Sequence, residues 1–98
     1  MVVTQLEGKV LPEKWDALKQ AYHAEMLEPL PPFIYQTFLV QSDTDRNTWR
    51  ILTFWKSRQD LMDYRASVDT PSGVLMFRAA DSEPNLSIFE VIDRSSVD

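Results

Sequence analysis

The segment Thr48–Trp55 constrains the fold most strongly, because it is apolar on both of its faces. It is rich in β-branched and aromatic residues and contains neither Gly nor Pro, which predicts a β-strand. Alternation places Trp49, Ile51, Thr53 and Trp55 on one face and Arg50, Leu52 and Phe54 on the other. A strand in a sheet with one wet face would alternate apolar with polar residues. We therefore expect this strand to be covered on both sides.

The residues that follow this strand predict a helix. Ser57 can cap its N-terminus, and Asp60 stands three residues later, in the spacing of a capping box. Leu61, Tyr64 and Val68 then recur on one stripe. A strand that passes directly into a capped helix is therefore the centre of the predicted fold.

Composition excludes several classes of function. The chain has 98 residues, which predicts a single domain spanning residues 1–98. The net charge of −5 and the lack of a basic cluster argue against nucleic-acid binding, which needs a basic face. Cys is absent, which excludes disulfides, thiolate catalysis and cysteine metal sites. No apolar run suits a spanning helix or a signal peptide, so we expect a cytoplasmic protein without a membrane partner.

The first part of the chain predicts a strand and a long helix. Residues 1–6 suit a short strand, which Gly8 should interrupt. Pro12 suits the first turn of a helix that extends to about residue 27. The apolar stripe of this helix consists of Trp15, Leu18, Tyr22 and Met26. A cluster of prolines then ends it.

The other segments predict two more strands and a third helix. Residues 33–41 suit a strand that is again apolar on both faces, and the polar residues 42–47 suit an antiparallel connection to the central strand. The remaining elements are a short helix over residues 74–80 with Ser72 as its cap, a last strand over residues 85–92, and a frayed tail over residues 94–98.

This element order predicts an α+β fold of the ferredoxin-like βαββαβ type, with one antiparallel sheet and its helices on one face. The other face would expose Leu52, Phe54 and one of the pairs Ile34/Phe38 and Tyr35/Leu39. Each large apolar side chain left in water forfeits roughly 1.5–3 kcal/mol. We therefore predict a homodimer that packs sheet against sheet. Arg50 would share this face and need a carboxylate, for which Glu90 is one candidate.

Three features of the sequence resemble the antibiotic biosynthesis monooxygenase-like family of the dimeric α/β-barrel superfamily. They are the element order, the proline-interrupted helix end before Phe33, and the junction Phe54-Trp-Lys-Ser-Arg-Gln-Asp-Leu61. In that family an aromatic residue, usually Trp, ends the strand before a Ser-capped helix. The resemblance covers residues 2–92. It implies two ferredoxin-like subunits whose sheets join into a barrel with the helices outside.

The resemblance also implies candidate activities. The family includes cofactor-free oxygenases of aromatic quinols and anthrones, haem-degrading enzymes and isomerases. In the quinol oxygenases a Trp matching Trp55 lines the pocket and an Asn one turn of strand earlier assists, whereas residues 51–53 here contain no Asn. Haem-degrading relatives carry an axial His where this chain has Tyr64 and Arg65, which argues against haem.

A ligand pocket is expected between the helices and the sheet. Its candidate lining residues are Trp55, Tyr22 and Tyr64, with Met76 and Phe77 as a lid. Such a wall would hold a flat apolar ligand and could offer N–H or O–H groups to its oxygen atoms. The alternative is that these side chains simply form the core of a small domain.

Candidate catalytic residues are Trp55 as a ring clamp, Tyr64 as an oxyanion donor and His23 as a proton acceptor. His23 is the only histidine and lies at the edge of the apolar stripe, where a surface position is the alternative. A single histidine offers no metal-ligand spacing, so we predict no metal and no cofactor.

Two functions remain open from the sequence. One is a cofactor-independent monooxygenase-like protein that acts on a small aromatic or enolic substrate. The alternative is a non-catalytic dimer of the same fold that binds a small ligand or has a structural role.

Overall fold

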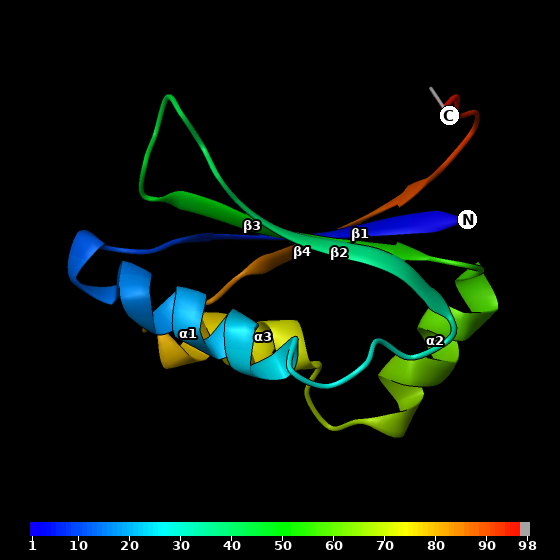
Figure 1. Cartoon of the computed structure of the whole chain (residues 1–98), viewed down its shortest axis with the longest axis horizontal. Helices are drawn as coiled ribbons and strands as arrows, with labels where there is room; N and C mark the ends of the chain where they lie inside the picture. Colours follow the sequence, from blue (N-terminus) through cyan, green and yellow to red (C-terminus); the bar gives the residue numbers. More distant parts are fainter. Residues whose placement is uncertain (97–98) are drawn as a thin grey trace.

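A computed structural model describes residues 1–96 (Figure 1). The strands are β1 (Val2–Lys9), β2 (Ile34–Gln41), β3 (Thr48–Trp55) and β4 (Asn85–Glu90). The helices are the 3₁₀ turn η1 (Pro12–Lys14), α1 (Trp15–Glu25), α2 (Arg58–Ser67) and α3 (Ser72–Ala79). The predicted βαββαβ order, with a short extra helix before the last strand, is confirmed.

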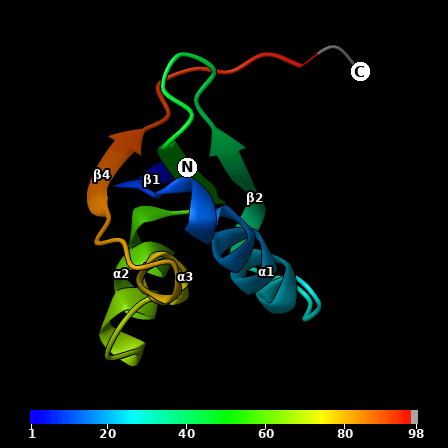
Figure 2. The same ribbon diagram turned by 90° about the vertical axis from the view of Figure 1, so that its left-hand side faces the viewer.

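The strands form one antiparallel sheet in the order β2-β3-β1-β4 within the described residues. The helices cover one face of this sheet and leave the other open (Figures 1 and 2). The α+β class and the ferredoxin-like arrangement are therefore as predicted. None of the helices in residues 1–96 is both long and apolar enough to cross a membrane.

β3 pairs with both β1 and β2, and its two faces are those predicted. Trp49, Ile51 and Trp55 are each only 5% exposed and pack beneath the helices. Leu52 and Phe54 are half-buried on the open face. The buried core therefore forms on one side of β3 only.

β1 runs to Lys9, past the end predicted at residue 6. Gly8 does not break the strand, because it pairs with Trp49 in the ladder. A Cβ atom on Gly8 would lie 2.8 Å from Cδ1 of Phe77, a residue of α3 with no exposed surface. Gly8 is therefore a point at which α3 packs closely on the sheet.

The pairing of β2 with β3 shifts register between Ile34 and Gln36, as at a β-bulge. The bulge breaks strict alternation, so neither of the expected pairs Ile34/Phe38 and Tyr35/Leu39 shares a face. Ile34 and Leu39 both pack against buried residues beneath the helices. Phe38 pairs with Leu52 on the open face and is 43% exposed.

Several helix and strand ends differ from the prediction. α1 ends at Glu25 and not near residue 27. Ser57 caps α2 as predicted, since its Oγ accepts a hydrogen bond from the Asp60 N–H at 3.1 Å. Ser72 is not a cap but the first residue of α3, which begins two residues earlier than predicted.

At the C-terminal end, β4 stops at Glu90, short of residue 92. Residues 94–96 of the predicted tail have no regular secondary structure, and residues 97–98 lie outside the described residues.

The open face of the sheet carries exposed aromatic side chains as well as polar residues such as Gln36 and Arg50. Phe38 and Phe89 are 43% and 52% exposed, and Phe38 packs edge-on against Phe54 with ring centroids 6.1 Å apart. The partner of Arg50 is Glu7 and not Glu90, because Glu7 lies directly opposite Arg50 in the ladder between β1 and β3. Arg50 Nε donates to Glu7 Oε1 at 2.7 Å.

Candidate functional site

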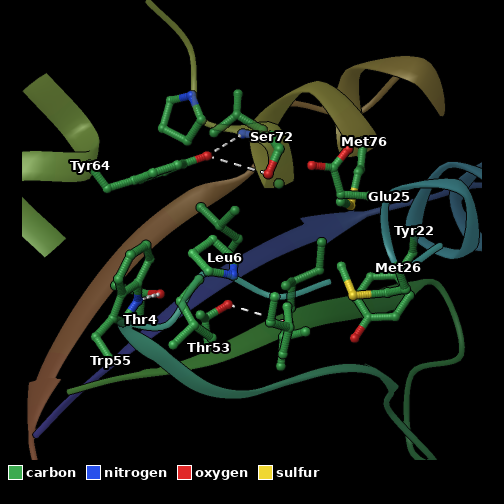
Figure 3. A pocket seen from close by; sticks show the side chains of 18 of the residues that line it. Thr4, Leu6, Tyr22, Glu25, Met26, Thr53, Trp55, Tyr64, Ser72 and Met76 are labelled. Atoms are coloured by element: carbon green, nitrogen blue, oxygen red, sulfur yellow. Dashed lines mark hydrogen bonds between the residues drawn. The ribbon is translucent and has the colours of Figure 1, made fainter. Parts of the chain in front are cut away.

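A cavity of about 370 Å³ lies between the helices and the sheet (Figure 3). Its lining comes from the four strands of the described sheet, from α1, α2 and α3, and from the Pro-rich segment after α1. Sites for small molecules typically have volumes of about 300–1,000 Å³. The cavity is therefore large enough for a small ligand.

Aromatic rings form one wall of the cavity. The wall consists of Trp55 and Tyr64; the ring of Phe33, which does not line the cavity, stacks on Trp55 with centroids 6.0 Å apart and an interplanar angle of 8°. The ring of Tyr64 lies 5.3 Å from Trp55. Trp55 is the last residue of β3, and the cap at Ser57 starts α2 directly after it, so the strand-to-helix junction brings Tyr64 back over Trp55. Such a wall suits the face of a flat apolar ring.

The indole N–H of Trp55 is already engaged. Nε1 donates to Thr4 Oγ1 at 3.0 Å, and Trp55 is 5% exposed (Figure 3). An N–H that has an acceptor inside the protein is not free for a ligand. Trp55 therefore offers its ring to the cavity and leaves the polar role to other groups.

Tyr64 is such a group. Its hydroxyl oxygen accepts a hydrogen bond from the backbone N–H of Ser72 at 3.1 Å. The Tyr64 hydroxyl in turn donates to Ser72 Oγ at 3.4 Å, which is long and therefore weak for an O–H···O bond. The phenol proton can exchange this weak bond for an acceptor on a ligand in the cavity that Tyr64 and Ser72 both line.

Four of the five predicted lining residues are brought together, and Phe77 is not. Trp55, Tyr22, Tyr64 and Met76 line the cavity. Phe77 has no exposed surface and belongs to the buried core. Its ring packs instead against Gly8 of β1, where a Cβ atom would lie 2.8 Å from Cδ1 of Phe77. The placement of Phe77 as a lid is therefore wrong.

His23 lies outside this site. It is exposed on α1, and the cavity is lined instead by Tyr22 and Glu25 on either side of it in the sequence. The carboxylates of Glu25 and Glu28 and the guanidinium of Arg65 are the charged groups of the described lining. All three residues are exposed, so the charge lies at the rim of the cavity.

Threonines on the floor of the cavity were not anticipated. Thr4, Thr37 and Thr53 come from three different strands, and all of them line the cavity. Alternation along β3 places Thr53 on the same face as Trp55. The pairing of the strands places Thr4 and Thr37 beside Thr53. This arrangement can be deduced only once the register of the strands is known.

The shifted pKa values lie outside the cavity. The hydrogen bond from Lys9 is the largest cause that lowers the pKa of Asp45 in the loop between β2 and β3. The hydrogen bond from Arg78 likewise lowers the pKa of Glu83. Within residues 1–96, no group of three or more His, Asp or Glu side chains is arranged to hold a metal ion.

Comparisons with known proteins establish the fold. No family model matches the sequence, and no curated protein matches it significantly. A Deinococcus radiodurans protein described as a candidate antibiotic biosynthesis monooxygenase superposes with a TM-score of 0.75 at 10% identity, over 99% of this chain and 98% of that one. A similar candidate from Nitrosomonas europaea gives 0.67 at 20% identity, over 95% and 100%.

A third structure is SnoaB, a cofactor-independent oxygenase from Streptomyces nogalater. It superposes with a TM-score of 0.62 at 12% identity, over 95% of this chain and 94% of that one. At these identities the resemblance that the sequence suggested is confirmed at the level of the fold.

Proposed function

We propose that the chain is a cofactor-independent monooxygenase-like protein that acts on a small aromatic or enolic molecule in this cavity. The observation that carries the proposal is the corner formed by Trp55 and Tyr64. There an aromatic wall stands beside a phenol whose oxygen accepts the Ser72 N–H and whose proton makes only a long bond to Ser72 Oγ, which a ligand oxygen can replace. The fold that the chain shares with SnoaB, named a cofactor-independent oxygenase, supports the same class of chemistry.

In this reaction an anthrone-like substrate loses a proton, and the resulting anion reacts with O₂. One oxygen atom becomes the new carbonyl oxygen, and the other leaves as water with the two hydrogens of the oxidised CH₂ group. The substrate supplies all the electrons, so no external reductant is required. The protein holds the ring against Trp55, and Tyr64 donates a hydrogen bond to the developing oxyanion.

The proton acceptor in this scheme is Glu25. A general base needs to come within hydrogen-bond reach of the substrate proton. Glu25 lines the cavity, whereas His23 is exposed on α1 outside it. We therefore assign the role that the sequence suggested for His23 to Glu25.

A non-catalytic ligand-binding dimer is the second candidate. The observation that favours it is the exposure of Glu25, Glu28 and Arg65 at the rim. Catalytic bases are commonly tuned by burial, and within residues 1–96 the cavity holds no buried ionisable base. Such a protein would bind the same flat ligands without turning them over.

Oxygen consumption with anthrones and naphthoquinols distinguishes these candidates. An enzyme should consume O₂ faster than the spontaneous reaction and form an equimolar amount of quinone. Tyr64→Phe removes only the hydroxyl and should lower the rate by about a hundredfold, as the loss of an oxyanion donor does. The control His23→Gln should have no effect. Saturable binding without catalysed uptake would favour the second candidate.

We also propose that the protein is a homodimer joined through the open faces of its sheets. The support is the apolar surface around Phe38, Phe54 and Phe89, because a patch of that kind on a monomer usually marks an interface. The helices lie on the opposite face of the sheet (Figure 2), and the cavity is lined by residues of these helices and of the sheet. Dimerisation would therefore leave the cavity accessible.

A further inference from the structure

Three threonines lie side by side across the floor of the cavity. In the strand register Thr53 of β3 is directly opposite Thr4 of β1 on one side and Thr37 of β2 on the other. All three line the cavity, and Thr4 and Thr53 are visible beneath it in Figure 3. The rest of the sheet lining consists of Trp55 and aliphatic residues. The hydroxyls thus form a polar row on a floor that is otherwise apolar.

Some hydroxyl protons of this row have no hydrogen-bond acceptor in the described part of the protein. Thr4 is 7% exposed, and its Oγ1 accepts from Trp55 Nε1. Among residues 1–96 no acceptor faces the Thr4 hydroxyl proton. The oxygens of Thr37 and Thr53 lie 3.4 Å apart, so one of these hydroxyls can donate to the other and the second proton stays free. Thr4 is the buried donor of the row, and a buried donor without an acceptor calls for an explanation, whereas Thr37 and Thr53 are only partly buried.

A ligand oxygen is the acceptor that fits. The described floor carries no charged group, because Glu25 and Arg65 lie at the rim. Neutral hydroxyl donors on an uncharged floor suit a neutral acceptor such as a carbonyl oxygen, and a carboxylate would lack a cationic partner there. The Tyr64–Ser72 contact lies on the helix side of the cavity, so the row is a separate polar anchor.

We propose that Thr4, Thr53 and Thr37 form a subsite for a carbonyl oxygen on the edge of a planar aromatic ligand, which rests on the proposed function of the cavity. The row selects ring systems that carry such an oxygen over the same rings without it. Because the row recognises an oxygen atom and not the ring, its effect on ligand affinity can be measured separately from the contribution of the aromatic wall.

The test measures the binding of menadione, a methylated naphthoquinone, and of methylnaphthalene, the same ring system without carbonyl oxygens. The chain contains no Cys, so menadione cannot add to a thiol. Wild-type protein should prefer menadione. Thr53→Val keeps the shape of the side chain and should weaken menadione binding by about three- to tenfold, the effect of one hydrogen bond, without changing methylnaphthalene binding.

Thr53→Ser is the matched variant, because it keeps the hydroxyl and loses the methyl group, and it should keep the preference for menadione. Thr37→Val repeats the test at the other end of the pair if Thr53→Val does not fold. If wild type and the Val variants bind both compounds equally, the subsite proposal is refuted, while ligand binding in the pocket is not. Binding of neither compound by wild type would overturn the pocket and the subsite together.

Discussion

Replacing Trp55 and Trp49 by Phe in turn tests how the candidate site is held together. Both residues belong to β3, point toward the helices and are 5% exposed, so both substitutions remove the same atoms from comparable burial. They differ in the indole N–H. Trp55 Nε1 donates to Thr4 at 3.0 Å, whereas Trp49 Nε1 is buried without an acceptor among residues 1–96.

This difference sets the relative stability of the two variants. Each loses ring packing, which costs about 1 kcal/mol or more. Trp55→Phe also loses a hydrogen bond with a net value of about 0.5–1.5 kcal/mol, while Trp49→Phe removes an unpaired buried donor that costs about 1–3 kcal/mol. Trp55→Phe should therefore be the less stable variant by roughly 2 kcal/mol. In a domain of this size that corresponds to roughly 10 °C in melting temperature.

Thermal unfolding followed by circular dichroism gives the two melting temperatures, and menadione binding gives the effect on the site. Trp55→Phe should change binding because Trp55 lines the cavity, and Trp49→Phe should not because it does not. Equal melting temperatures, or a lower one for Trp49→Phe, would refute the hydrogen-bond reasoning. Unchanged ligand binding in Trp55→Phe would refute the role of Trp55 as a wall of the pocket.

Two further substitutions test the interface and the packing of α3. Phe54→Asp should yield monomers or aggregates in sedimentation experiments at micromolar concentration, because it places a charge in an apolar interface; Met62→Asp on α2 should not, and an intact Phe54→Asp dimer would refute this interface. Gly8→Ala should lower the free energy of unfolding by about 1–3 kcal/mol, because its Cβ would meet the buried ring of Phe77. Gly73→Ala should be nearly neutral, since its Cβ would meet the tip of a flexible leucine; equal losses in urea unfolding would show that the Phe77 ring moves aside.

The centre of the fold could be predicted because its signals are local. The alternation along β3 fixes which residues share a face, and the Ser57 cap depends on a residue three positions away. Both features came out as predicted. The apolar residues on both faces of β3 also indicated that both faces are covered, and a partner on the open face stays a prediction.

The structure differs from the prediction where contacts between residues far apart in the sequence determine the local conformation. A glycine between polar neighbours normally indicates a turn, but Gly8 continues β1 because the Phe77 ring occupies the place of a side chain. The bulge near Ile34 shifts the faces of β2, and nothing local marks it, because a bulge is defined by the partner strand. Phe77 was misplaced because its packing against Gly8 of β1 is a long-range contact that the helical pattern does not show.

The same distinction separates the two halves of the candidate site. Large aromatic residues at a strand end and on a helical stripe, such as Trp55 and Tyr64, can be predicted as lining residues from their spacing. Their size is enough for them to form a wall of the cavity. A threonine in a strand is ordinary by composition, and Thr53 gains significance only when the register sets Thr4 and Thr37 beside it. The apolar lining of the cavity can therefore be predicted from the sequence. The polar groups that would select a ligand cannot, because they depend on the pairing of three strands.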